Sequence, residues 1–248
     1  MDNILDFEVD GLSIDDEFEK KVKEQKPITV GNNDDKKKTK KNKIDLFKET
    51  PDPIELDPST IKKANYITFV INDISTKIPD DKLNKIEAIF KHLGKDGKGY
   101  GIRIYCNKIN SQVFQLVRKY FSYDRTVFVK PWEKYCNVSK FKIFTPSDEN
   151  IKASVKYVKN FHKLPTGIKY IKAAMLTLLL GPYNNSALKY VLVYDPHYTN
   201  PKQNIDFKKS KETSDVYFII NNLKDVHTFD IFNMYKNEDV QDLVTLIK

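Results

Sequence analysis

Apolar residues follow two different periods along residues 61–248. Short apolar runs, typical of buried strands, alternate with segments in which apolar residues recur every three or four positions, as in helices. The runs predict five strands, at 66–71, 101–106, 126–129, 190–194 and 228–232. The periodic segments between the first three predict helices at 80–93 and 110–120. Strands and helices that alternate at this spacing indicate an α/β domain with a mainly parallel sheet flanked by helices.

The second half of the domain is predicted to hold a loop and more helix. After a loop through Pro146, a long helix is expected over 147–181, with Ser147 as its cap and a break near 164–167. Residues 173–180 are apolar nearly all round, which predicts packing inside the domain or against another subunit. Residues 210–223 fit a helix better than a strand, and a closing helix is expected at 238–247.

Charge divides the chain into two parts of opposite sign. Residues 1–60 carry 16 acidic and 11 basic side chains, a net charge of −5, whereas residues 61–248 carry 18 acidic and 31 basic ones, a net charge of +13. The overall charge of +8 hides this division. We therefore expect a charged arm at 1–60 and a basic domain at 61–248.

The arm has the composition of a segment that does not fold by itself. Its first 19 residues contain eight acids and no base, interleaved with apolar residues, and three prolines disfavour helix over 50–60. The arm is expected to be disordered or ordered by a partner. Two interpretations stay open: a solubilising tail, or a segment that docks on a protein partner or lies on the basic domain as a mimic of nucleic acid.

The positive domain favours an anionic partner, because phosphate neutralisation supplies most non-specific affinity for nucleic acid. One group of lysines recurs at helical spacing in the long predicted helix: Lys152, Lys156, Lys159 and Lys163. The stripe is either a solvated helix face or a ridge that follows phosphates. Lysine far outnumbers arginine in the chain, whereas readers of base edges usually use arginine.

Polar residues follow several of the predicted strands. In open α/β sheets, ligands bind outside the carboxyl ends of the strands, near the point where the strand order reverses. Asn and Asp are also common in the turns that follow any strand, so each residue has a purely structural alternative. The candidate ligand-binding residues are Asn72, Asp73, Cys106, Asn107, Ser111, Asp195, His197 and Thr199.

Motifs for catalysis and cofactor binding are missing from the sequence. The chain has eight glycines and contains neither a G-x-G-x-x-G nor a G-x-x-x-x-G-K-[ST] loop. The four histidines are scattered, and the two cysteines form no pattern from which a disulfide framework or a zinc site could be assembled. Cys106 is interpreted as a nucleophile or, more simply, as a buried structural thiol. The sequence predicts no cofactor, no metal and no membrane span. We expect the protein to stay in a reducing compartment.

Four strings, VINDI at 70–74, VFVKPW at 127–132, LVYDP at 192–196 and TFDIFN at 228–233, resemble the SLOG superfamily of Rossmann-like nucleotide-binding proteins. That superfamily includes the DNA-processing protein A and lysine-decarboxylase-like phosphoribohydrolase families and small phage-encoded members. The resemblance spans about residues 66–234 and implies the fold and a nucleotide pocket. The glycines that such pockets carry after the first, second and fourth strands are absent here, which argues against nucleotide hydrolysis.

Three functions remain as hypotheses. The first is a SLOG-like protein without an intact catalytic motif that binds nucleotide or nucleic acid; the composition suits an AT-rich genome, such as that of a phage. The second is a structural component of a larger, virion-like assembly, in which the arm and residues 173–180 make protein contacts. The third is an enzyme acting on nucleotides through Asp73, Asp195 and Cys106. A location in the cytoplasm or in a virion is expected.

Overall fold

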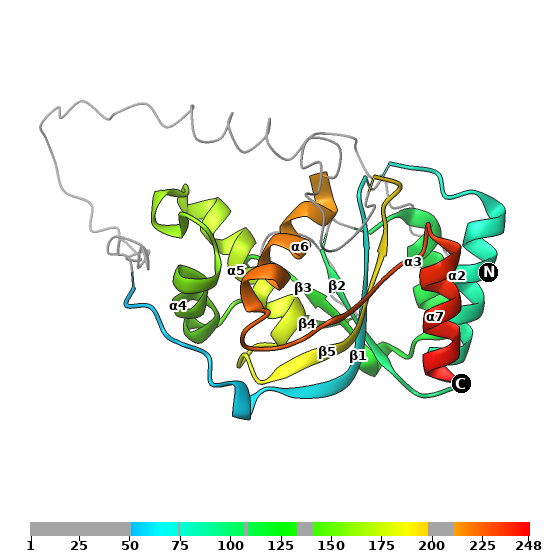
Figure 1. The fold of residues 1–248 in the computed structure, drawn as a ribbon, viewed down its shortest axis with the longest axis horizontal. Coiled ribbons are helices and arrows are strands. Elements are labelled where there is room, and N and C mark those ends of the chain that lie inside the picture. Colours follow the sequence, from blue (N-terminus) through cyan, green and yellow to red (C-terminus); the bar gives the residue numbers. More distant parts are fainter. Residues whose placement is uncertain (1–50, 74, 107–108, 133–140, 198–210) are drawn as a thin grey trace, which may run out of the picture. The chain divides into compact units, whose positions relative to one another are not determined.

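The computed structural model describes residues 51–73, 75–106, 109–132, 141–197 and 211–248. These residues belong to one compact unit, which begins at Asp45. Residues 1–50 lie outside the described part of the chain, so the predicted arm is tested only at its end. The described residues form a six-stranded sheet with helices on both faces (Figure 1).

All of the strand pairs in this sheet are parallel, as the sequence predicts. The strand order is β4-β3-β2-β1-β5-β6, so β1 lies between the strand that follows it and one that comes much later. The direction of winding therefore reverses between β1 and β5. The strands are β1 (Lys62–Ile71), β2 (Gly101–Tyr105), β3 (Thr126–Val129), β4 (Lys142–Phe144), β5 (Ser186–Tyr194) and β6 (Asp230–Asn233).

Two helix layers cover the sheet. The first layer consists of α2 (Asp80–Leu93), α3 (Ser111–Tyr120) and α7 (Asn237–Ile247), and the second of α4 (Asp148–Tyr157), α5 (Thr166–Leu180) and α6 (Lys211–Leu223). Figure 1 shows α2 and α7 on one side of the strands and α4, α5 and α6 on the other. Each layer buries its own apolar cluster against the sheet. The alternation of β1 divides its side chains between them, with Val70 in the cluster of the second layer and Ile71 in that of the first.

Local signals in the sequence account for the helices of the first layer. Asn110 caps α3 by accepting hydrogen bonds from the backbone N–H groups of Gln112 and Val113. Helix α2 is followed by Gly94, where an added Cβ would lie 2.1 Å from the carbonyl oxygen of Tyr120, so the close approach of the C-terminal ends of α2 and α3 needs glycine. The predictions for 80–93 and 110–120 are confirmed.

The second layer differs from its prediction. The expected long helix over 147–181 is three elements: α4, a 3-10 turn at Phe161–Lys163, and α5. Helix α4 ends at Tyr157 because Val158 takes an extended backbone, and the interruption runs to Pro165, so it begins earlier than predicted but includes the expected break near 164–167. Within it, Asn160 takes the left-handed conformation with φ of 54°. The expected loop through Pro146 contains the short edge strand β4. Residues 173–180 are buried inside the domain, with exposures of 0 to 2%.

The last ten residues of the predicted arm, 51–60, pack against the domain. Leu56 is buried, and its backbone N–H donates to the hydroxyl of Tyr157 at 3.2 Å. The backbone N–H of Ile54 donates to the carbonyl of Lys152 at 3.4 Å. This segment thus ties the start of β1 to α4. No helix among the described residues is long and apolar enough to cross a membrane.

Candidate functional site

Strand order brings two of the candidate ligand-binding residues together. Asn72 directly follows β1 and Asp195 directly follows β5, and these strands are neighbours with Ile71 opposite Tyr194. The backbone N–H of Asn72 donates to the carbonyl of Tyr194 at 3.1 Å, which extends the ladder by one residue. Both residues are buried, with exposures of 6% for Asn72 and 0% for Asp195. They lie where the winding reverses, as the interpretation of the sequence requires.

Asn233 extends the sheet on the other side of Asp195. Its side-chain oxygen accepts from the backbone N–H of Asp195 at 3.1 Å, and its amide donates to the Asp195 carbonyl at 2.7 Å. The backbone N–H of Asn233 in turn donates to the carboxylate of Asp239 at 2.7 Å. Asn233 therefore acts as a backbone substitute at the end of β6, which is a structural role.

Asp73 and His197 take part in turns. The Oδ1 atom of Asp73 accepts from the backbone N–H and the hydroxyl of Ser75, at 2.9 and 2.6 Å. The Oδ1 atom of Asp195 accepts from the backbone N–H of His197 at 2.9 Å. In both cases an aspartate bonds two residues ahead, the pattern of an Asx turn. Asp73 and His197 are exposed, and the bonds agree with the structural alternative for these positions.

The remaining candidates contribute no reactive group. Cys106 is buried and disulfide-bonded, which corrects the expectation of a free thiol. Spacing in the sequence does not report which cysteines meet in the fold, and without a thiol the nucleophile interpretation has no support. Ser111 is the exposed first residue of α3. Asn107 and Thr199 lie outside the described residues.

The helix N-termini nearest the carboxyl edge are poor seats for phosphate. A phosphate at such a position needs free backbone N–H groups and no competing negative charge. Helix α2 instead begins with Asp80 and Asp81, and α7 has Glu238 and Asp239 in its first turn. Asn110 already occupies the N–H groups of α3. The geometry therefore argues against the phosphate-binding mode that dinucleotide-binding folds use.

One polar atom at this edge has no partner. The Oδ1 atom of Asn72 is buried and accepts no hydrogen bond, although almost every buried polar group in a folded protein is paired. The side chain of Asn110, the N-cap of α3 in the connection that follows the neighbouring β2, is equally buried but bonds the N–H groups of α3 and the carbonyl of Thr76. Asn72 is therefore the unusual member of the pair.

The four lysines predicted to contact nucleic acid are all exposed. Lys152 and Lys156 lie on α4, but the break after Tyr157 takes Lys159 and Lys163 off that helix, so the predicted continuous stripe is wrong. Lys156 pairs with Glu55 at 2.5 Å, whereas no carboxylate of the described chain pairs with the other three. We call these four residues the lysine surface.

The lysine surface belongs to a stretch without any acid. Residues 150–194 contain seven lysines and neither Asp nor Glu. This run covers most of α4, all of α5 and β5. The lysines of this run therefore have no acid within their own segment.

Sequence reasoning missed a buried cation in the same layer. Arg103 of β2 is 2% exposed and donates to the carbonyls of Leu178 and Ser186 at 3.3 and 2.8 Å, and to the Ser186 hydroxyl at 2.7 Å. Its guanidinium lies over the ring of Tyr66. Burial lowers the pKa of Arg103 to about 10. The arginine supplies the cation at the end of α5, whose last turn contains no basic residue of its own.

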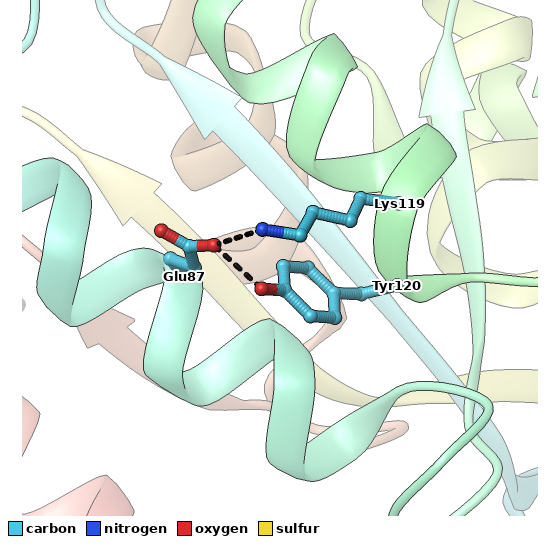
Figure 2. Close-up of polar contacts among 3 residues, drawn as sticks. All are labelled: Glu87, Lys119 and Tyr120. Atoms are coloured by element: carbon cyan, nitrogen blue, oxygen red, sulfur yellow. Dashed lines mark hydrogen bonds and ion pairs between the residues drawn. The ribbon is translucent and has the colours of Figure 1, made fainter.

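The first layer holds a different polar group, drawn in Figure 2. Glu87 of α2 accepts from the ammonium of Lys119 at 2.8 Å and from the hydroxyl of Tyr120 at 2.5 Å, both on α3. The bonds from Lys119 and Tyr120 lower the pKa of Glu87, and the bond to Glu87 raises the pKa of Lys119. A carboxylate stabilised as an anion beside a stabilised cation is a helix cross-link and not an acid–base pair.

A groove of about 650 Å³ lies between the segment before β1 and the C-terminal ends of α4 and α6. Its size is in the range of small-molecule sites. Its polar lining is mainly acidic and exposed, and Asn222 bridges it by donating to the Tyr157 carbonyl at 2.9 Å. The lining residues are Glu55, Leu56, Asp57, Pro58, Lys156, Tyr157, Asn222, Asp225 and Val226.

Within the described residues, no three His, Cys, Asp or Glu side chains form a group that could hold a metal ion. No family model, curated protein or solved structure matches the chain.

Proposed function

We propose that the chain is a nucleic-acid-binding protein without a catalytic site, whose basic domain contacts the phosphate backbone through the lysine surface. The observation that carries the proposal is the acid-free run of residues 150–194 with its seven lysines. A polyanion gains affinity from each cation that displaces its condensed counterions, provided that no protein carboxylate already neutralises that cation. Among the described residues, no carboxylate pairs with Lys152, Lys159 or Lys163, so these three meet the condition.

The carboxyl edge supports nucleic acid over a free nucleotide. A mononucleotide gains much of its affinity from one tightly bound phosphate group, for which the fold uses helix N-termini. Those of α2 and α7 carry acids, and that of α3 is capped by Asn110. A polynucleotide needs no such cradle, because its affinity is the sum of several weak and exposed contacts. The resemblance to the SLOG superfamily stays part of the proposal, as a hypothesis about the family of this chain.

The test is a salt titration of binding to a labelled DNA duplex. The variant replaces the four residues of the lysine surface by Ala. The logarithm of the binding constant should fall with the logarithm of salt for the wild type, and the variant should lose a slope of up to about 2.7, since each of the three lysines without a carboxylate partner contributes about 0.9. The variant should also bind the duplex more weakly than the wild type at low salt.

A matched control removes the same charge from the other helix layer. Lys77, Lys91, Lys95 and Lys98 are exposed and lie in or beside α2. Their replacement by Ala should leave most of the salt slope in place. An equal loss in both variants would mean that net charge and not this surface binds DNA. If the wild type fails to bind either DNA or RNA at low salt, the proposed function is wrong.

A further inference from the structure

Residues 51–58 lie against α4 as an extended segment, which we call the strap. The backbone N–H of Ile54 donates to the carbonyl of Lys152 at 3.4 Å, and that of Leu56 donates to the hydroxyl of Tyr157 at 3.2 Å. The side chain of Leu56 is 6% exposed and belongs to the apolar cluster of the second layer. The strap is therefore fixed to the helix at two alternate positions.

Glu55 lies between these two fixed positions, and its carboxylate pairs with Nζ of Lys156 at 2.5 Å. An exposed ion pair is usually weak, because two long side chains lose conformational freedom when they meet. Here the backbone on both sides of the glutamate is already held, so the pair has less freedom to lose. The hydrogen bond from Lys156 to Glu55 also raises the pKa of the lysine. The strap thus supplies a positioned counter-charge to one residue of the lysine surface.

The strap carries charge of one sign only. It contains three acids and no base, and all three acids are exposed: Asp52, Glu55 and Asp57. A polyanion that approaches Lys156 is repelled by these carboxylates and has to displace Glu55 before a phosphate can take its place. The other three residues of the lysine surface have no such competitor among the described residues.

We propose that the strap is an autoinhibitory contact, in which Glu55 masks Lys156 from nucleic acid and release of the strap adds this lysine to the surface that binds phosphate. The inference rests on the proposed function, because it concerns regulation of the same surface. Its action leaves the sheet and helices in place, since the ion pair is exposed and only residues 51–58 have to move.

Glu55→Gln removes the masking charge and keeps the size of the side chain. In the salt titration with duplex DNA, its slope should exceed that of the wild type by about 0.9, and it should bind about eightfold more tightly in about 0.1 M salt, the effect of one more phosphate contact. Asp52→Asn is the matched control, because Asp52 belongs to the same strap but forms no ion pair with the described residues. It should leave the slope unchanged. Equal gains in both variants, or no gain in Glu55→Gln, overturn the inference.

Lys156→Ala shows whether the gain comes from the unmasked lysine. In the wild-type background it should hardly change the salt slope, because Lys156 is already neutralised. In the Glu55→Gln background it should remove the added slope of about 0.9. An equal loss of slope in both backgrounds would mean that Glu55 does not mask this lysine.

Leu56→Ala releases the strap without any change of charge. It should steepen the salt slope in the same direction as Glu55→Gln, with urea unfolding used to confirm that the variant is folded under the assay conditions. Ile61→Ala is its control, because Ile61 is 7% exposed in the same apolar cluster but lies beyond the strap. A folded Leu56→Ala variant with the slope of the wild type contradicts the inference.

Acylation of lysines by acetic anhydride, followed by mass spectrometry without nucleic acid, tests the masking separately from DNA binding. Only a neutral amine reacts, so Lys156 should be acylated faster in Glu55→Gln than in the wild type, by about twofold or more, as its pKa falls toward the ordinary value. Lys152 should react equally in both and serves as the internal reference. Unchanged acylation of Lys156 refutes the masking even if the wild type binds DNA. A masked Lys156 in a chain that binds neither DNA nor RNA refutes the proposed function, and the inference falls with it.

Discussion

The two helix layers of this domain handle charge in opposite ways. In the first layer, a half-buried carboxylate of α2 holds a lysine and a tyrosine of α3, so this lysine has its counter-charge within the layer. In the second layer, Arg103 is buried against carbonyl oxygens, and the lysines of residues 150–194 have no acid in their own segment. The net charge of the domain thus says little about where an anion can bind, and its distribution between the layers says more.

The largest change in the free energy of unfolding is expected for Arg103, the buried cation. Arg103→Met should lower the free energy of unfolding by about 2–4 kcal/mol, because the carbonyls of Leu178 and Ser186 lose their donors in the core. Arg118→Met, on the exposed face of α3, should change it by about 0.5 kcal/mol or less. Urea unfolding measures both. Equal effects would contradict the contrast between a buried and an exposed arginine.

The next effect concerns the buried amide that joins α4 to α5. Asn150 is 0% exposed, accepts from the N–H of Ser147 and donates to the Gly181 carbonyl and the Asn184 side chain. Asn150→Ala should cost about 2–3 kcal/mol in urea unfolding, more than the about 1 kcal/mol expected for loss of the α3 cap in Asn110→Ala. A larger loss of stability in Asn110→Ala than in Asn150→Ala would indicate that the first layer depends more on its polar contacts than the second layer does.

A smaller effect is expected for the exposed cross-link of the first layer. Glu87→Gln should lower stability slightly at neutral pH, and the difference should shrink with added salt, since exposed ion pairs are screened. Because the pKa of Glu87 is lowered in the folded protein, its contribution is present above the ordinary value of 4.5 and is lost as pH falls through the folded value. A difference from the wild type that persists in acid would exclude the carboxylate as its source.

The smallest change in stability is expected from the titration of His227, which lies between α6 and β6. Burial, followed by the charge of Lys63, lowers its pKa from the ordinary 6.5. The unfolded chain therefore binds a proton more readily, so stability should fall as pH drops below about 6.5. His227→Gln should flatten this part of the stability curve, measured by urea unfolding at several pH values. An unchanged slope would assign it to other groups.

Strong local signals explain which elements could be predicted. Helix α2 begins and ends where its period and Gly94 indicate, and the cap at Asn110 marks the start of α3. The three residues of β4 are too few to show a period, and their pairing with β3 is a long-range contact. The break after Tyr157 begins with the extended backbone of Val158 and continues through the left-handed backbone of Asn160, and neither residue type requires these conformations.

The candidate site shows the same division. Polar residues after the strands were predicted, because parallel strands place their carboxyl ends at one edge. The pairing of Asn72 with the end of β5 required the strand order. Asp73 and Asp195 turned out to bond their own turns, and the prediction for Asn107 and Thr199 remains untested because they lie outside the described residues.

The amino-acid sequence by itself determined the parallel α/β class, most helix and strand positions and the acid-free run of seven lysines at residues 150–194, since periodicity, caps and charge are local properties. Tertiary structure alone decided that Arg103 is buried beneath α5, that Glu87 of α2 pairs with Lys119 of α3, and that one asparagine at the sheet edge has an unpaired oxygen. These features depend on which distant segments meet, and contacts of that kind leave no pattern along a single chain.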